Sequence, residues 1–195
     1  MNFAIKILSK ELTKLIKHTF SNMPNKIMVV GLGNVDTTAD SIGPNVIKQI
    51  EITRHILKYA PSLLPCNTKE ISAISPGVLG TTGIETEEII KSVSEIVKPD
   101  LIIVIDALAS NNIDRLLKTI QICNTGITPG SGVNNKRKEL SEETLGTKVI
   151  AIGVPTVIPS KEYNLIMMPK EIDDLADNLE EIISSGINRA LMPQR

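Results

Sequence analysis

Aromatic side chains are scarce in this sequence: they make up 2% of its 195 residues, and tryptophan is absent. Proteins that bind single-stranded nucleic acid usually stack successive bases on aromatic rings, and this chain has almost none to offer. The formal net charge of −1 also provides no overall field that would attract a polyanion or an anionic membrane. We therefore expect no direct nucleic acid binding and no membrane partner.

Cysteine and histidine are equally rare, with two residues of each. Cys66 and Cys123 match no metal-binding or redox spacing, which predicts unpaired thiols in a reducing, intracellular compartment. His18 and His55 fall on separate predicted helices without a second ligand at metal spacing. Neither a histidine metal site nor a Ser–His–Asp triad is predicted, and no cofactor is expected.

Long apolar runs are missing as well. No segment reaches the roughly 20 apolar residues that a membrane-spanning helix needs. Residues 1–20 are rich in aliphatic side chains, but lysines and Glu11 interrupt them and no cleavage site follows. They predict an amphipathic N-terminal helix rather than a signal peptide, and the protein is expected to be soluble and cytoplasmic.

The hydrophobic residues, 42% of the chain, gather in short runs rich in valine and isoleucine. Such runs are typical of strands buried on both faces in a parallel sheet, and here they alternate with helical patterns. The predicted strands are 27–33, 70–74, 100–109, 119–123 at an edge, and 148–155; the predicted helices are 1–20, 41–59, 84–97, 111–117 and 169–191. We predict one domain over residues 1–195, a three-layer α/β/α fold with a mostly parallel central sheet.

Two carboxylates follow predicted strands where α/β proteins bind their ligands. Asp106 comes at the carboxyl end of the apolar run 100–109, and Asp40 lies just beyond the glycine-rich exit of strand 27–33. Two carboxylates held close together cannot both ionise easily, so the pair keeps one proton and provides an acid and a base that activate water against a carbonyl. Asp40 and Asp106 are the predicted catalytic residues.

Other interpretations of these residues stay open. Asp40 could be a helix N-cap and Asp106 a turn former, with purely structural roles. A carboxylate metal site that adds Glu85 is a further possibility. The segment 31–36 is similar to a dinucleotide-binding fingerprint, but Asp36 stands where the third glycine belongs, which argues against an NAD site.

Two loops are predicted to shape a substrate cleft. The glycine-rich loop before helix 84–97 offers backbone N–H groups to a developing oxyanion or a peptide carbonyl, although a tight turn explains it equally well. The long irregular segment 124–138 is typical of a functional loop, and its basic run 136–138 either grips an acidic peptide or is simply solvated. The predicted substrate-binding residues are Thr82, Gly83, Glu85, Pro129, Gly130, Ser131, Lys136 and Arg137.

A series of sequence blocks resembles the germination protease of spore-forming bacteria. The blocks include VVGLGN at 29–34, ITRH at 52–55, TGIET at 82–86, IDALA at 105–109, PGSGV at 129–133, NKRKE at 135–139, ETLG at 143–146 and VIAIGVPT at 149–156. They occur in the same order from about residue 27 to residue 157, and the resemblance resumes at 168–172. So many ordered blocks make the resemblance specific.

The resemblance implies an endopeptidase that degrades small acid-soluble spore proteins during germination, located in the spore core. It implies an aspartic peptidase whose catalytic acids correspond to Asp40 and Asp106, a homotetramer made as a zymogen with an N-terminal propeptide, and a core similar to the hydrogenase-maturation peptidases, with their phosphorylase/hydrolase-like fold. We accordingly expect a homo-oligomer.

This chain departs from the family pattern in three ways. The propeptide region is largely missing, the segment between Val157 and the final helix is short, and Asn124 stands where an acid is common. Besides an active aspartic peptidase, two alternatives follow: a metal-dependent peptidase of the same fold, or a non-catalytic shortened paralogue that binds spore proteins.

Overall fold

The computed structural model describes residues 1–131, 137–160 and 165–192. Within these ranges strands and helices alternate along the chain, as the hydrophobic pattern predicts. The strands are β1 (Lys26–Gly31), β2 (Glu70–Ile74), β3 (Leu101–Ala109), β4 (Gln121–Cys123), β5 (Lys148–Ser160) and β6 (Leu165–Met167). The longer helices are α1 (Asn2–Thr19), α5 (Thr86–Val97) and α7 (Ile172–Leu191), and the shorter ones are α2 (Ile42–Ile47), α3 (Arg54–Tyr59), α4 (Leu79–Thr82) and α6 (Glu142–Leu145).

The strands form one sheet in the order β2-β1-β3-β5-β4, with β6 paired to β5. β1 runs parallel to β2 and β3, and β3 runs parallel to β5, whereas β4 and β6 are antiparallel to β5. The register places Gly31 opposite Ile105, and Asp106 opposite Gly153. The carboxyl ends of β1, β2 and β3 therefore meet at one edge of the sheet, and the predicted mostly parallel sheet is confirmed.

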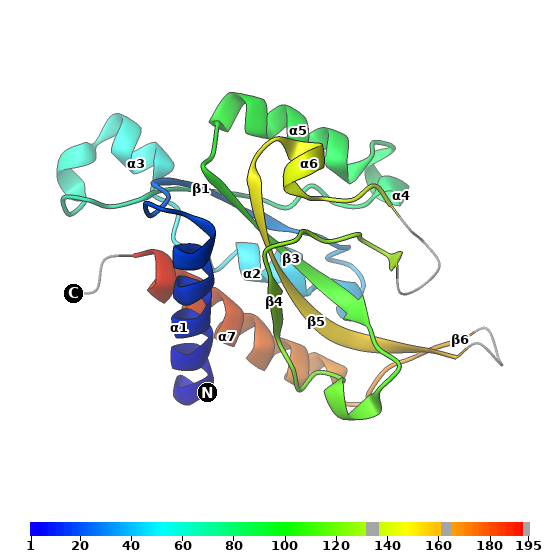
Figure 1. The fold of residues 1–195 in the computed structure, drawn as a ribbon. Coiled ribbons are helices and arrows are strands. Elements are labelled where there is room, and N and C mark those ends of the chain that lie inside the picture. Colours follow the sequence, from blue (N-terminus) through cyan, green and yellow to red (C-terminus); the bar gives the residue numbers. More distant parts are fainter. Residues whose placement is uncertain (132–136, 161–164, 193–195) are drawn as a thin grey trace.

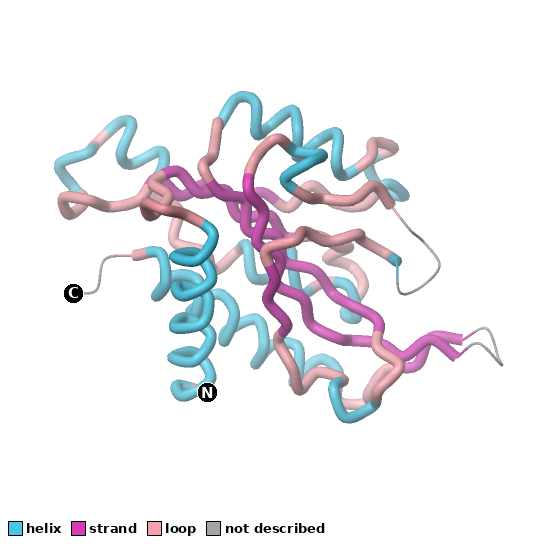
Figure 2. Tube along the Cα trace, viewed as in Figure 1, coloured by secondary structure: helices cyan, strands magenta, loops and turns pink. Residues whose placement is uncertain are grey.

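Helices cover both faces of this sheet (Figure 1). α1, α2 and α7 lie on one face, and α5 and α6 lie on the other. Figure 2 shows the strands running as one twisted band between these two groups of helices. Side chains alternate along β3, so that Ile103 packs in the core under α7 and Val104 packs in the core under α5. Burial on both faces explains why β3 is an uninterrupted apolar run.

The outer helix pair is formed by α1 and α7, which lie close together. Gly186 of α7 permits this approach, because a Cβ atom there would lie 2.8 Å from a methyl carbon of Leu8. Leu12 and Ile16 complete the buried face of α1, which confirms the predicted amphipathic helix. Among the helices in the described ranges, none has the length and apolarity needed to cross a membrane.

The helix predicted over residues 41–59 is wrong in its middle. α2 ends at Ile47 and α3 begins at Arg54, and the chain between them turns toward strand β2. Thr53 pairs with that strand: its N–H donates to the carbonyl of Ile71 (3.1 Å), and its hydroxyl accepts the N–H of Ile71 (2.8 Å). These bonds to a distant strand outweigh the local helical pattern.

The predicted helix at 111–117 is only a single 3-10 turn, η3 (Ile113–Arg115). Its predicted polar cap is present, since the side chain of Asn112 accepts the N–H of Asp114 (2.8 Å). The turn stops because the N–H of Leu117 donates to Pro155 of strand β5 (2.7 Å). Strand β5 also continues to Ser160, beyond the predicted end at residue 155, and there it pairs with β6, which the sequence did not indicate.

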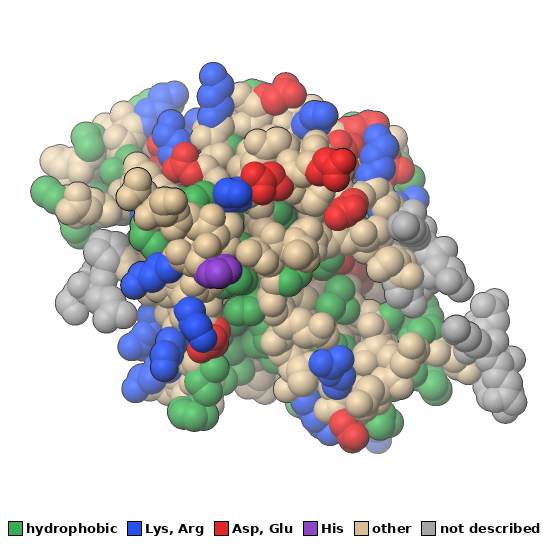
Figure 3. Space-filling model, in the orientation of Figure 1, with side chains coloured by type: hydrophobic (Ala, Val, Ile, Leu, Met, Phe, Trp, Pro, Cys, Tyr) green, Lys and Arg blue, Asp and Glu red, His purple; other side chains and the backbone are tan. Residues whose placement is uncertain are grey.

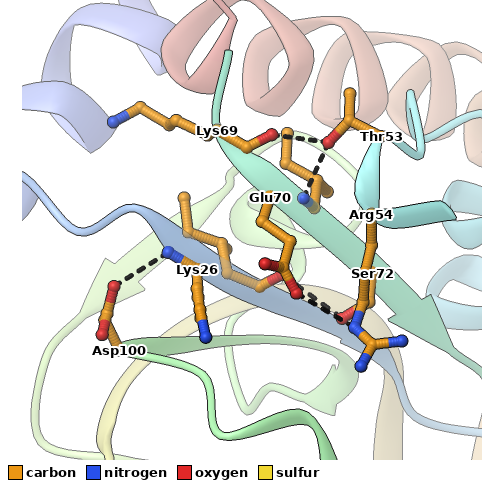
Figure 4. A network of polar contacts seen from close by, with 9 residues as sticks. Lys26, Thr53, Arg54, Lys69, Glu70, Ser72 and Asp100 are labelled. Atoms are coloured by element: carbon orange, nitrogen blue, oxygen red, sulfur yellow. Dashed lines mark hydrogen bonds and ion pairs between the residues drawn. The ribbon is translucent and has the colours of Figure 1, made fainter. Parts of the chain in front are cut away.

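A polar network fastens the amino ends of the central strands, opposite the edge with the two aspartates (Figure 4). The carboxylate of Asp100 accepts the N–H groups of Asn25 and Lys26, both at 2.8 Å, and so ties β3 to β1. Arg54 and Glu70 form an ion pair at 3.0 Å beside β2. This end of the sheet is held by structural polar contacts, which leaves the carboxyl edge as the place to look for chemistry.

Candidate active site

Asp40 and Asp106 both lie at the carboxyl edge of the sheet. Asp106 belongs to β3, and Asp40 ends a 3-10 turn, η1 (Thr38–Asp40), in the loop that follows β1. The backbone of Leu32 keeps this loop on β3, since its N–H donates to the carbonyl of Ile105 (2.8 Å). The loop after β1 therefore leads Asp40 back toward the strand that carries Asp106.

Three neighbours fix the position of Asp40. The N–H of Asn34 donates to its carboxylate (2.8 Å), and the hydroxyl of Thr156 donates to the carbonyl of Ala39 (2.7 Å). Gly33 has a φ of +117° and packs directly on the turn, because a Cβ atom there would lie 1.9 Å from the carbonyl oxygen of Asp40. The turn is thus held by strand β5 on one side and by the loop after β1 on the other.

Asp106 is a buried carboxyl with an unmatched oxygen. Its side chain is 4% exposed, and among the described residues its Oδ2 atom has no hydrogen-bond partner. The pKa of Asp106 is raised to about 7, chiefly by burial and also by the negative charge of Asp40, while the backbone N–H of Ala107 partly opposes the rise. Burial disfavours the charged form of a carboxyl group, so Asp106 is placed to hold a proton near neutral pH.

The pKa of Asp40 is also raised, chiefly by burial, while the hydrogen bond from Asn34 lowers it. The Coulombic effect of Asp40 on Asp106 means that the two carboxyl groups titrate as a coupled pair. The two structural roles considered from the sequence, a helix N-cap for Asp40 and a turn former for Asp106, do not match the structure. Ser41 is the N-cap of α2 and the Asp40 carboxylate binds Asn34 instead, while Asp106 lies inside a strand and not in a turn.

The predicted residues Thr82, Gly83 and Glu85 lie in the connection between β2 and α5, which starts at the same edge of the sheet. Thr82 ends α4, where its hydroxyl donates to the carbonyl of Val78 (3.1 Å) and accepts the N–H of Ile84 (3.1 Å). Gly83 is the left-handed C-cap of α4, and Glu85 is the N-cap of α5. The connection is a hydrogen-bonded turn between α4 and α5 that borders the carboxyl edge of the sheet.

The second predicted loop meets the same helix. Pro129, Gly130 and Ser131 precede an undescribed stretch, and Lys136 lies outside the described residues. The N–H of Arg137 donates to the carbonyl of Pro129 (3.1 Å), which closes the base of the loop. Lys138 then bridges to α5 through Glu87 (3.3 Å) and Glu88 (3.5 Å), which raise the pKa of Lys138. The structure brings the two predicted substrate loops together at the start of α5, whereas the contacts that fix Asp40 come from other residues.

Sequence reasoning gave no role to Asn34, Gly33 or Thr156, although all three hold the turn that carries Asp40. The glycine-rich exit of β1 was a visible signal for a tight backbone approach. Thr156 offered only a weak signal, a hydroxyl after a proline in an apolar run.

Residues 1–131, 137–160 and 165–192 contain no group of three His, Cys, Asp or Glu side chains that could hold a metal ion. Asp40, Asp106 and Glu85 therefore do not form the carboxylate metal site considered from the sequence. Both cysteines are free thiols. Asp36 lies in a pocket of about 240 Å³ whose lining also includes Asp173, Asp177 and Glu180 of α7. So many carboxylates would repel a pyrophosphate, in agreement with the argument against an NAD site.

The α/β fold of this chain is similar to that of a solved hydrogenase maturation protease. A NiFe hydrogenase maturation protease from Thermococcus kodakarensis KOD1 superposes with a TM-score of 0.53 at 21% identity, covering 90% of this chain and 97% of the other. The chain belongs to the germination protease family, whose sequence model matches residues 2–162.

Individual relatives agree with this assignment. A germination protease of Clostridium tetani is 43% identical, over 96% of this chain and 72% of the relative. Another, from Caldanaerobacter subterraneus, is 42% identical, over 95% of this chain and 74% of the relative. Both alignments extend over more positions, 235 and 238, than the 195 residues of this chain. The relatives therefore contain residues inside the aligned region that have no counterpart here, as expected of a shortened member.

Proposed function

We propose that this protein is an endopeptidase that degrades small acid-soluble spore proteins during germination, and that Asp40 and Asp106 are its catalytic pair. Membership of the germination protease family supports the substrate and the reaction. The observation that carries the catalytic assignment is the buried Asp106. Among the described residues its Oδ2 atom has no hydrogen-bond partner, and the negative charge of Asp40 contributes to its raised pKa. Perturbed and coupled acids at a strand edge are candidates for general acid and base catalysis.

The two carboxyl groups have different surroundings, which suggest a different role for each. Asp106 is the more deeply buried and keeps the shared proton, whereas Asp40 accepts the N–H of Asn34, which favours its ionised form. The Asp40 carboxylate takes a proton from a water molecule, whose oxygen attacks the peptide carbonyl carbon. Asp106 donates its proton to the carbonyl oxygen. Asp40 then donates its proton to the peptide nitrogen and Asp106 takes a proton from a hydroxyl of the tetrahedral intermediate. Cleavage of the C–N bond releases an amine and a carboxylic acid, and both carboxyl groups return to their starting states.

The two loops that meet at α5 are proposed to form the substrate cleft. The connection containing Thr82, Gly83 and Glu85 and the loop containing Pro129–Ser131 and Arg137 are linked by the ion pair between Lys138 and Glu87. This ion pair joins residues that are 51 positions apart in the sequence. We also propose that the protein acts as a homo-oligomer in the spore core, as the family resemblance implies.

Incubation of the purified chain with a small acid-soluble spore protein tests the catalytic assignment. We expect cleavage that persists in the presence of a chelator. Asp40→Asn and Asp106→Asn should each lower kcat by roughly 10² to 10⁴-fold, the usual contribution of general acid–base catalysis. Asp114→Asn, which changes an exposed acid on η3, is the matched control and should retain full activity.

The outcomes separate the alternatives. Full activity in either Asp40→Asn or Asp106→Asn would refute the pair, and loss of activity with chelator that metal restores would select a metallopeptidase. No cleavage by a well-folded wild-type chain would identify a non-catalytic binder of spore proteins. The oligomeric state is measured separately by light scattering, and a monomer that cleaves normally would refute only the proposed assembly.

A further inference from the structure

A basic groove lies between α1 and the end of α7, on the helical layer that covers one face of the sheet. It has a volume of about 700 Å³ and is lined by both helices. Its cationic residues are Lys6, Lys10, Lys14 and Lys17 from α1 and Arg189 from α7. The proposed proteolysis uses none of these residues.

The lysines form the solvent face of α1. Leu8, Leu12 and Ile16 occupy the opposite face and are buried, so the charges project outward along the whole helix. The one acid on this helix, Glu11, contacts Lys14 at 3.6 Å and offsets a single positive charge. In Figure 3, Lys and Arg side chains gather over the region of α1, whereas acidic and basic side chains are mixed over α5.

The spacing of these cations is regular. The lysines follow one another at intervals of four, four and three residues, and each residue advances an α-helix by about 1.5 Å. The row therefore covers roughly 16 Å. One strand of a DNA duplex places a phosphate about every 3.4 Å along its axis, so the row faces about five phosphates.

We propose that this groove binds the sugar-phosphate backbone of duplex nucleic acid without regard to sequence. The cations match a regular line of anions, and the lining contains no aromatic side chain that could stack on a base. Lysines of α1 and Arg189 of α7 both line the groove, so a line of phosphates along it can contact both helices. The sequence-based expectation of no nucleic acid binding rested on scarce aromatic residues, which matter for single strands, and on a net charge of −1. That net charge conceals a segregated basic surface.

Fluorescence anisotropy with a labelled random-sequence DNA duplex of about 20 base pairs tests the proposal, because backbone binding weakens linearly with salt on a logarithmic scale. We expect a slope of log K against log salt of up to about −4.5 if all five cations contact phosphates, measured from about 50 to 200 mM. Lys10→Gln/Lys14→Gln should reduce the slope by about 1.8, since each lost contact changes it by about 0.9. Lys91→Gln/Lys118→Gln alters two exposed lysines elsewhere and should leave the slope unchanged.

Any of three results would overturn the proposal: no binding at about 50 mM salt, equal weakening in both double variants, or competition by polyglutamate as effective as that by unlabelled duplex. The last result would instead identify a site for acidic peptides. If DNA does not bind, tight binding to phosphatidylserine vesicles would identify a membrane-surface site instead. Thermal unfolding of each variant confirms that folding is unchanged, and the assay is independent of whether the protein cleaves spore proteins.

Discussion

Thr156 of strand β5 donates a hydrogen bond of 2.7 Å from its hydroxyl to the backbone carbonyl of Ala39, the residue before Asp40. Thr156 is 1% exposed, so no bulk water can replace the bond if it is lost. It joins residues 117 positions apart and connects the turn that carries Asp40 to a strand of the central sheet. We infer that Thr156 positions Asp40 relative to Asp106.

Thr156→Val tests this positioning role, because valine has nearly the same shape but no hydroxyl. Loss of a buried hydrogen bond should reduce the free energy of unfolding by about 1 to 3 kcal/mol. Looser placement of Asp40 should reduce kcat by roughly tenfold or more with little change in KM. Thr156→Ser restores the hydroxyl and should recover most of kcat. Equal kcat values in the valine and serine variants would contradict the role.

Gly33→Ala should disrupt the same turn from its other side. The added Cβ would lie 1.9 Å from the carbonyl oxygen of Asp40, and the φ of +117° is unfavourable for alanine. Either the turn moves or the protein loses stability by roughly 2 kcal/mol or more, and activity should fall in both cases. Gly146→Ala is the control, because Gly146 also has a positive φ (+67°) but nothing lies within 4 Å of a Cβ at that position. Urea unfolding and peptidase assays of both variants measure the difference.

The strands of the sheet could be predicted from the sequence because the hydrophobic pattern that identifies each strand lies within that strand. An unbroken apolar run such as 101–105 identifies a strand buried on both faces, and the amphipathic patterns identify α1, α5 and α7. The helix predicted over 41–59 failed at Thr53, where bonds to Ile71 of another strand decide the conformation. Similarly, β6 exists only through pairing with the extension of β5.

Part of the candidate site could likewise be predicted from the sequence, and part could not. The positions of Asp40 and Asp106 follow from a general rule about the carboxyl ends of parallel strands. The bonds that hold Asp40 could not be predicted, because Thr156 approaches Ala39 only in the folded chain. The burial of Asp106, which sets its pKa, also depends on tertiary packing and has no local signature.

A substitution at the amino ends of the strands, away from Asp40 and Asp106, should change stability without changing catalysis. The Asp100 carboxylate accepts two backbone N–H groups at 2.8 Å, from Asn25 and Lys26. Asp100→Ala leaves both donors to water and should lower the free energy of unfolding by about 1 to 2 kcal/mol. The kcat of the folded variant should equal that of the wild type, because the carboxyl edge is untouched. A large fall in kcat would show that the two ends of the sheet are coupled.

Replacing Asp106 by asparagine should stabilise the protein at neutral and alkaline pH. The folded-state pKa of about 7 lies above the ordinary value of 3.8 that applies when the chain is unfolded. As pH rises from about 4 to about 7, the unfolded state releases this proton first, so the free energy of unfolding of the wild type falls with pH. Asparagine has no proton to lose and avoids this penalty.

The difference between Asp106→Asn and the wild type should therefore be small near pH 4, grow up to about pH 7 and then level off at roughly 4 kcal/mol or less. Urea unfolding at several pH values measures it, with Asp114→Asn, which changes an exposed acid on η3, as the control variant. A constant difference between about pH 4 and pH 8 would mean that Asp106 is ionised throughout this range. It would then lack the proton that the proposed mechanism requires, even if the variant were inactive.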